Sequence, residues 1–228
     1  MQKVFGLTMF ILLLIVPPAL SAAENEEVDH QGRGWALDTK LGTLGIGVDL
    51  NRSIIPCVLN LRVGASFFSH SINFNDEGIN YNAKLKLGAV PIAVDVFPFK
   101  NWFRLGGGVV ISLNEMHASG QTSTGTWEIG DGVYTAQDIG QMYGKIKANR
   151  VAPYLGLGFN NPITRKGHLG FFADLGLLYH GTPSAVMTTT KTVPQLQADI
   201  DKEIRDVNDD IREFKLFPVV QLGFSYRF

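Results

Sequence analysis

The stretch PVVQLGFSYRF, residues 218–228, decides the fold class of this sequence. Counting back from Phe228 in steps of two, every second residue to Val220 is apolar or aromatic, and the residues between are mostly small or polar. This period of two is typical of a β-strand with two different faces. A strand at the end of the chain would fray in a soluble sheet, whereas a closed barrel pairs its last strand with its first. The stretch therefore predicts a β-barrel.

The same alternation occurs in three earlier segments, 57–67, 103–113 and 169–179. One face of each segment is apolar, and the other carries glycines with Arg, Asp or Asn in mid-strand. Each has about the 9 to 11 residues that a tilted strand needs to cross a bilayer. Lipid outside and a narrow polar lumen inside account for both faces. A soluble β-sandwich or a lipocalin-like barrel is the alternative that periodicity leaves open.

The composition argues against several classes of protein. The chain has 228 residues, a net charge of -1 and one cysteine, Cys57. A nearly neutral chain does not predict binding to nucleic acid. One cysteine cannot form an internal disulfide, and the absence of a CxxC motif or a Cys/His cluster predicts neither a metal site nor a cofactor.

The first 23 residues predict a secretory signal. Lys3 precedes an apolar run over 4–16, and the small residues 21–23 follow it. An N-terminal anchor is the weaker alternative, because about 13 apolar residues fall short of the roughly 20 that a spanning helix needs. We predict a signal peptide at 1–23 and an outer-membrane β-barrel domain over 24–228.

The strand count must be even, because both ends of an outer-membrane barrel lie in the periplasm. If residues 35–50 form one strand, the barrel has seven strands. Its apolar face, however, moves from odd positions to even ones, with Leu44 on the new face; a hairpin at Gly42-Thr43 or a bulge explains the change. The hairpin gives eight antiparallel strands, at 35–41, 44–50, 55–68, 79–97, 102–114, 145–159, 168–190 and 216–228. The predicted links are short turns at 51–53, 98–101 and 160–166, and external loops at 69–78, 115–143 and 191–213.

Two segments within the external loops predict structure of their own. From Val193 to Phe214 the apolar residues are spaced by three and four, which predicts an amphipathic helix, with Pro194 in its first turn and many acidic residues on its other faces. We expect its apolar stripe to pack on the barrel mouth or on neighbouring loops; partner binding is the alternative. Gly130-Asp131-Gly132 predicts a small hairpin over 127–134.

The inward-facing polar side chains are the candidate site. They carry both signs of charge, as an enclosed ion network requires, because an unpaired buried ion is costly. The predicted lumen-lining residues are Asp38, Lys40, Asp49, Asn60, Arg62, Arg104, Ser112, Asn114, Asp174, Gln221 and Arg227. Trp35 and Trp102 lie at strand ends, where an aromatic interface girdle is expected.

Several stretches resemble a known family. NDEGINYNAKLKL (75–87), VAPYLGLGFNNP (151–162), LGFFADLGLLYHGTP (169–183) and FKLFPVVQLGFSYRF (214–228) are similar to small outer-membrane proteins of Gram-negative bacteria. They are more distantly similar to the eight-stranded barrels associated with carbapenem susceptibility, which are linked to uptake of basic amino acids. The resemblance implies an outer-membrane location, contact with lipid and lipopolysaccharide, and a C-terminal signal at Tyr226 and Phe228 for the barrel assembly machinery.

Three functions follow from different features. The polar lumen favours a narrow channel for small polar or cationic solutes, which the acidic helix could concentrate at the mouth. An eight-stranded lumen can also be filled by side chains, so a non-conducting barrel with functional loops is the alternative. A lipid-modifying enzyme is a remote alternative that depends on His180 near Ser184. Because no GxSxG motif is present, we expect no catalysis.

Overall fold

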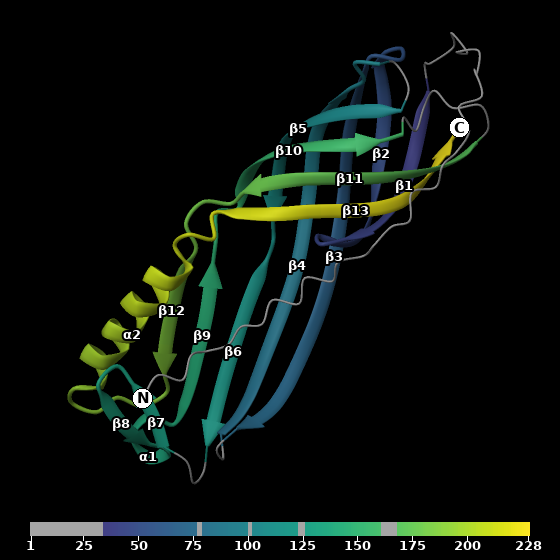
Figure 1. Cartoon of the computed structure of the whole chain (residues 1–228). Helices are drawn as coiled ribbons and strands as arrows, with labels where there is room; N and C mark the ends of the chain where they lie inside the picture. The colour runs from purple at the N-terminus through teal and green to yellow at the C-terminus, as the bar shows by residue number, and fades with distance from the viewer. Residues whose placement is uncertain (1–33, 77–78, 100–101, 123–125, 161–167) are drawn as a thin grey trace.

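The computed structural model describes residues 34–76, 79–99, 102–122, 126–160 and 168–228. The predicted signal peptide at 1–23 lies outside these residues. Figure 1 shows an elongated molecule with a barrel at one end and a sheet that extends from it at the other. Among the described residues, no helix is long and apolar enough to cross a bilayer.

Eight antiparallel strands close the barrel. They are β1 (Trp35–Gly42), β2 (Gly45–Ile55), β3 (Leu59–Asp76), β4 (Ile79–Val96), β5 (Phe103–Ser112), β10 (Val151–Phe159), β11 (Leu169–Tyr179) and β13 (Leu216–Arg227). Each strand pairs with the next in this order, and β13 pairs with β1 to complete the ring. The predicted all-β, eight-stranded antiparallel barrel is confirmed.

The predicted first hairpin is present, because Gly42 pairs with Gly45 across a two-residue turn. Thr43 fastens this turn to β13: its backbone N–H donates to the carbonyl of Val220 at 3.0 Å, and its hydroxyl donates to that of Pro218 at 2.9 Å. The expectation that Leu44 faces lipid was wrong. Leu44 lies in the turn and not in the strand, so its side chain is buried inside the barrel.

The predicted turn at 51–53 was also wrong. These residues continue β2, and Asn51 and Ser53 are buried on its inward face. The chain turns instead at 56–58, where Pro56 ends the strand and Cys57 has a φ of 60°. The error arose because polar residues that face a polar lumen, here Asn51 and Ser53, have the same composition as a turn.

Beyond the barrel, β3 and β4 continue into a sheet that we call the extension (Figure 1). It is completed by β6 (Glu115–Thr122), β9 (Gln141–Lys147) and β12 (Ser184–Thr189), in the order β3-β4-β6-β9-β12. The predicted loops at 69–78 and 115–143 were therefore largely wrong, since most of 69–76 and 115–122 is strand. The predicted strands 145–159 and 168–190 are each interrupted, at 148–150 and 180–183. Strands exposed to water carry many polar residues, which made them look like loops.

A small core covers the inner face of the extension. It is formed by β7 (Thr126–Ile129), β8 (Gly132–Thr135), α1 (Ala136–Ile139) and α2 (Leu196–Ile211). Leu196 and Ile200 of α2 are buried against Trp127 and Ile139. The predicted hairpin is confirmed, and the helical stripe packs on a neighbouring loop as expected. The prediction that Pro194 lies in the first helical turn was wrong: the chain turns at Pro194 and Gln195, the latter with a φ of 75°, so the helix begins at Leu196, and it ends at Ile211.

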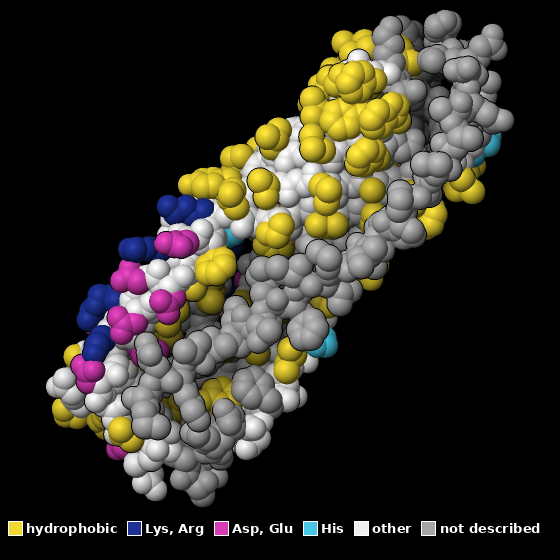
Figure 2. All heavy atoms as spheres, in the orientation of Figure 1, with side chains coloured by type: hydrophobic (Ala, Val, Ile, Leu, Met, Phe, Trp, Pro, Cys, Tyr) yellow, Lys and Arg dark blue, Asp and Glu magenta, His cyan; other side chains and the backbone are white. Residues whose placement is uncertain are grey.

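The outer surface of the barrel is apolar. Figure 2 shows hydrophobic side chains gathered over the barrel, whereas Lys, Arg, Asp and Glu gather on α2. Leu155 and Leu169, at 70% and 71% exposure, would be badly placed in water. Near the end remote from the extension, Trp102 stacks on Phe99 and Phe159 with ring centroids 6.0 and 5.9 Å apart. An apolar wall with a ring of aromatics is the exterior of a membrane-spanning barrel.

Candidate functional site

The centre of the lumen is crossed by an ionic layer. Arg62 on β3 lies against Asp95 on β4, with Nε 3.0 Å from Oδ2, and donates from Nη1 to Oδ2 of Asp174 on β11 at 3.1 Å. Arg104 on β5 donates from Nε to Oδ1 of Asp174 at 3.0 Å. Strands β3 and β11 lie on opposite walls of the barrel, so these contacts join the walls. All four residues are at most 3% exposed.

The ionic layer continues along β1 and β2. Lys40 donates to Asp49 at 2.6 Å, and Asp49 lies 3.9 Å from Nη1 of Arg62. Asn51 donates to Asp38 at 2.8 Å. Each ammonium and guanidinium group therefore has a carboxylate within reach, which is the condition under which buried charges are tolerated.

Glycines make room for the carboxylates of this layer. Asp49 pairs with Gly64, and Asp174 pairs with Gly158. A Cβ at Gly64 would lie 1.7 Å from Oδ1 of Asp49, and one at Gly158 would lie 2.2 Å from Oδ1 of Asp174. Both distances are far below van der Waals contact. Gly64 and Gly158 therefore provide the space that the ion network occupies.

Above the ionic layer, toward the extension, the lumen is filled by an apolar layer. Its buried members come from the first hairpin and from β4, β5, β10, β11 and β13: Leu44, Ala89, Val110, Ala152, Tyr154, Leu178 and Val219. Phe217 packs against them. The alternation in the sequence predicted a polar lumen, so this apolar layer was missed.

The predicted lumen residues occupy three kinds of place. Nine are buried inside the barrel: Asp38, Lys40, Asp49, Asn60, Arg62, Arg104, Ser112, Asp174 and Gln221. Asn114 is half-buried in the break between β5 and β6, where its side-chain oxygen accepts from the backbone N–H of Gly88 at 2.9 Å. Arg227 is half-buried opposite Ala36, near the end of β13. A role for these residues in solute passage stays a prediction.

Sequence reasoning missed Asp95, a central member of the ionic layer. The signal was present, because Asp95 alternates with the outward-facing Val94 and Val96. Tyr226 and Phe228, the predicted assembly signal, point outward, and the backbone N–H of Phe228 donates to the carbonyl of Trp35 at 3.1 Å. That contact helps to close the barrel; recognition by assembly machinery stays a prediction.

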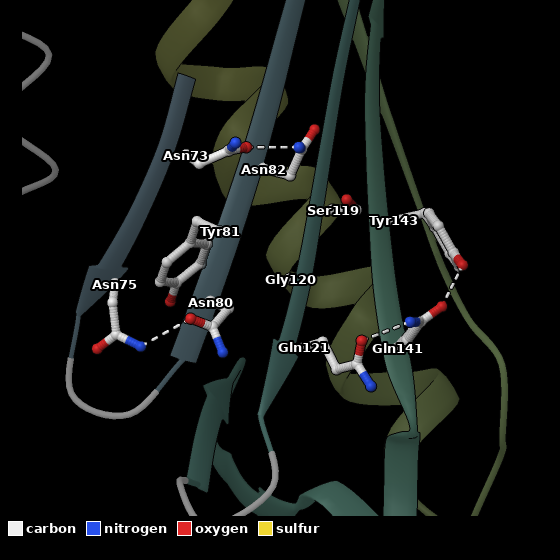
Figure 3. Close-up of a pocket in the computed structure, with 10 residues that line it drawn as sticks. All are labelled: Asn73, Asn75, Asn80, Tyr81, Asn82, Ser119, Gly120, Gln121, Gln141 and Tyr143. Atoms are coloured by element: carbon white, nitrogen blue, oxygen red, sulfur yellow. Dashed lines mark hydrogen bonds between the residues drawn. The ribbon is translucent and has the colours of Figure 1, made fainter. Parts of the chain in front are cut away.

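The outward face of the extension forms a second candidate site. Neutral amides and hydroxyls line a hollow of about 610 Å³ near its tip. Asn82 donates to Asn73 at 2.5 Å, and Asn75 donates to Asn80 at 2.8 Å (Figure 3). Farther along the sheet, Gln141 donates to Gln121 at 2.7 Å and accepts from the phenol of Tyr143. We call these residues, with Ser119, the amide rows.

Basic side chains follow on the same face, toward the barrel. Lys84 pairs in register with His117, and His117 pairs with Lys145, so the three lie in one row. Lys86 and Lys147 lie two residues nearer the barrel on the same strands. Glu115, which pairs in register with Lys86, accepts from Lys145 at 3.4 Å and lies 3.3 Å from His117. These contacts with His117 and Lys145 lower the pKa of Glu115. We call this group the basic rows.

Comparison with solved structures shows what this geometry is similar to. The CarO protein of Acinetobacter baumannii superposes with a TM-score of 0.56 and 20% identity, over 85% of this chain and 97% of CarO. This chain has the barrel fold of CarO. A second structure, CarO2 of the same organism, gives a TM-score of 0.57 and 18% identity, over 89% of this chain and all of CarO2.

No family model matches the sequence, and no curated protein matches it. The resemblance to small outer-membrane barrels is thus confirmed for the fold. The identity is too low to transfer an activity, so function must be argued from the two candidate sites. Within the described residues, no group of three His, Cys, Asp or Glu side chains is arranged to hold a metal ion.

Proposed function

We propose that this protein is a closed outer-membrane barrel that displays the extension at the bacterial cell surface. The orientation follows from the ends of the barrel. Strand β1 begins and β13 ends at the side opposite the extension (Figure 1). Because the chain ends of outer-membrane barrels lie in the periplasm, the extension stands outside the cell.

One observation carries the proposal, namely the double seal of the lumen. The ionic layer joins opposite walls through Arg62 and Asp174, and the apolar layer around Leu178 lies above it. A solute would have to separate buried ion pairs and then pass the apolar layer. Removing one partner of a buried ion pair costs about 3 to 5 kcal/mol, so these pairs are expected to resist separation. A closed barrel that presents its external part is therefore the better-supported function, as in the non-conducting alternative above.

The test is the conductance of the refolded mature protein in planar bilayers, together with solute flux into loaded liposomes. We expect no discrete openings and no flux, alongside a general porin as positive control in the same membranes. A Leu44→Ser/Leu178→Ser variant, which loosens only the apolar layer, should also stay closed, because the ionic layer still joins opposite walls of the barrel. Regular openings of the unmodified protein would contradict the proposal.

Passage of small polar or cationic solutes is the second candidate. The observation in its favour is that four carboxylates, Asp38, Asp49, Asp95 and Asp174, face three cationic groups, Lys40, Arg62 and Arg104, in the lumen, which leaves one negative charge in excess. Such a lumen would select cations once the apolar layer opened. Flux of lysine without flux of glutamate, in the same liposomes, would support this candidate over the closed barrel.

A further inference from the structure

The amide rows and the basic rows form one continuous outward surface of the extension. The hollow beside the amide rows and a second hollow of about 480 Å³ beside the basic rows share Asn82, Ser119 and Tyr143. Figure 3 shows the amide side chains on this face, with α2 behind the sheet. The small core, which includes α2, covers the inner face of the extension. Among the described residues, the outward face is therefore open to a partner.

The charge on this surface is strongly one-sided. Lys84, Lys86, Lys145 and Lys147 oppose a single described acid, Glu115. Two lysines on β4 and two on β9, with β6 between them, mark a rectangle of about 7 by 10 Å. In the described part of the chain, no carboxylate forms an ion pair with Lys84, Lys86 or Lys147. The surface is therefore complementary to an anion larger than one carboxylate.

The basic rows lie directly above the lipid-facing wall. Ser69, Lys86 and Glu115 form one row in register, and Phe67 and Leu113 occupy the next row toward the barrel. Phe67 and Leu113 are 62% and 56% exposed, as side chains in contact with lipid would be. The lysine ammonium groups thus stand where hydrocarbon ends and headgroups begin.

The order of these three zones matches one kind of molecule. From the barrel outward, the surface offers apolar side chains, then ammonium groups, and then neutral amides and hydroxyls. Acyl chains, phosphates and sugars occur in this order in a phosphorylated glycolipid. Amides can donate to and accept from neighbouring sugar hydroxyls, and the exposed ring of Tyr143 offers a stacking surface.

We propose that the outward face of the extension binds lipopolysaccharide of the outer leaflet through its phosphates and inner sugars. The proposal rests on the proposed function, because it needs the extension outside the cell. A glycerophospholipid would satisfy the lysines but would not reach the amide rows. A protein partner would be expected to require a buried apolar centre, which this polar surface lacks.

The test measures binding of fluorescent lipopolysaccharide to the mature protein in detergent micelles. In a K84Q/K145Q/K147Q variant, we expect binding to weaken by about tenfold or more, since three charge-assisted contacts to phosphate are lost. Dephosphorylated lipopolysaccharide should lose a similar factor on the unmodified protein. The matched control is R205Q/R212Q/K215Q, which removes three positive charges from the exposed side of α2 and the start of β13 and should bind as the unmodified protein does.

A second pair of measurements tests the sugar contacts. An N80A/N82A variant should bind complete lipopolysaccharide several-fold more weakly and bind its lipid portion without core sugars unchanged. Circular dichroism and heat-modifiable gel mobility establish that each variant is folded. Unchanged binding by the folded lysine variant would overturn the proposal, as would equal competition by phosphatidylglycerol. The assay does not depend on conductance, so a conducting barrel would refute the proposed function and leave this result readable.

Discussion

Strand β4 runs through both regions of the molecule, and its two faces exchange character on the way. In the barrel, Ile92 and Val94 point outward and Asp95 points into the lumen. In the extension, Lys84 points outward, whereas Tyr81 packs inward against Trp127 with ring centroids 5.9 Å apart. The pleat continues unchanged. What differs is the solvent, hydrocarbon around the barrel and water around the extension.

The exchange takes place in the same row on three neighbouring strands. On β3 it lies between Phe67 and Ser69, and between β5 and β6 it lies between Leu113 and Glu115. The shared position marks where the apolar wall of the barrel gives way to the polar outward face of the extension. Alternation therefore identifies a strand, whereas the polarity of its outward-facing side chains indicates whether lipid or water surrounds it.

Of the features compared, the buried ion pairs inside the barrel are expected to contribute most to its stability. Asp174→Ala would remove one of the two carboxylates that Arg62 and Arg104 share and leave both buried guanidinium groups to Asp95, so we expect a loss of about 3 to 5 kcal/mol in the free energy of unfolding. Urea titration of the protein in lipid vesicles, followed by tryptophan fluorescence, measures it. Asp209→Ala, which removes an exposed carboxylate of α2, is the control and should leave the titration midpoint unchanged.

The outward faces supply the next largest effect. Val94→Lys places an ammonium group in the lipid-facing wall and should cost about 2 to 4 kcal/mol if Val94 lies near the bilayer centre. Asn82→Lys adds an ammonium group on the same strand and face, but in water, and should cost at most the hydrogen bond that Asn82 donates to Asn73, about 1 kcal/mol. Similar losses from both substitutions would show that β4 does not pass from lipid to water.

Packing around the ionic layer gives a smaller effect. Gly158→Ala would place a Cβ 2.2 Å from Oδ1 of Asp174 and 2.3 Å from Nε of Arg104. Overpacking of this kind usually costs about 1 to 3 kcal/mol. Gly107→Ala is the control, because its Cβ would meet only Leu155, at 4.0 Å. If both variants unfold at the same urea concentration as the unmodified protein, a glycine is not needed at position 158 to make space for the ionic layer.

Most of the barrel could be predicted from the sequence because one medium surrounds it. The first hairpin was found from its phase change, and the inward set was found by alternation. The apolar layer was not predictable, because the height of Val110 or Val219 in the lumen depends on register. The extension was missed because residues 69–76, polar on the outward face, looked like a loop. Allowing for one strand to pass from lipid into water, so that its outward side chains change from apolar to polar, would have corrected that error.

The extension should also respond to pH where the barrel does not. Tyr134 donates from its phenol to the buried carboxylate of Asp199, which fastens β8 to α2. This hydrogen bond, with burial and the charge of Asp199, raises the pKa of Tyr134 from 10.0 to about 12. A group whose pKa is raised on folding stabilises the folded state below its ordinary pKa, and that contribution is lost as the pH rises through the folded value. The contact should therefore weaken between about pH 10 and 12.

The fluorescence of Trp127, which packs beside Tyr134, reports on this weakening once Trp35 and Trp102 are replaced by Phe. In that background, we expect the Trp127 emission to shift toward longer wavelength over this pH range, while barrel circular dichroism stays constant. Tyr134→Phe removes both the titrating group and its hydrogen bond, so its emission should show no step there. A step that persists in Tyr134→Phe would mean that another group titrates, and a simultaneous loss of barrel signal would mean that the two regions unfold as one unit. We expect the extension and the barrel to respond to pH separately, because the extension is stabilised by its own apolar core and not by the lipid-facing wall.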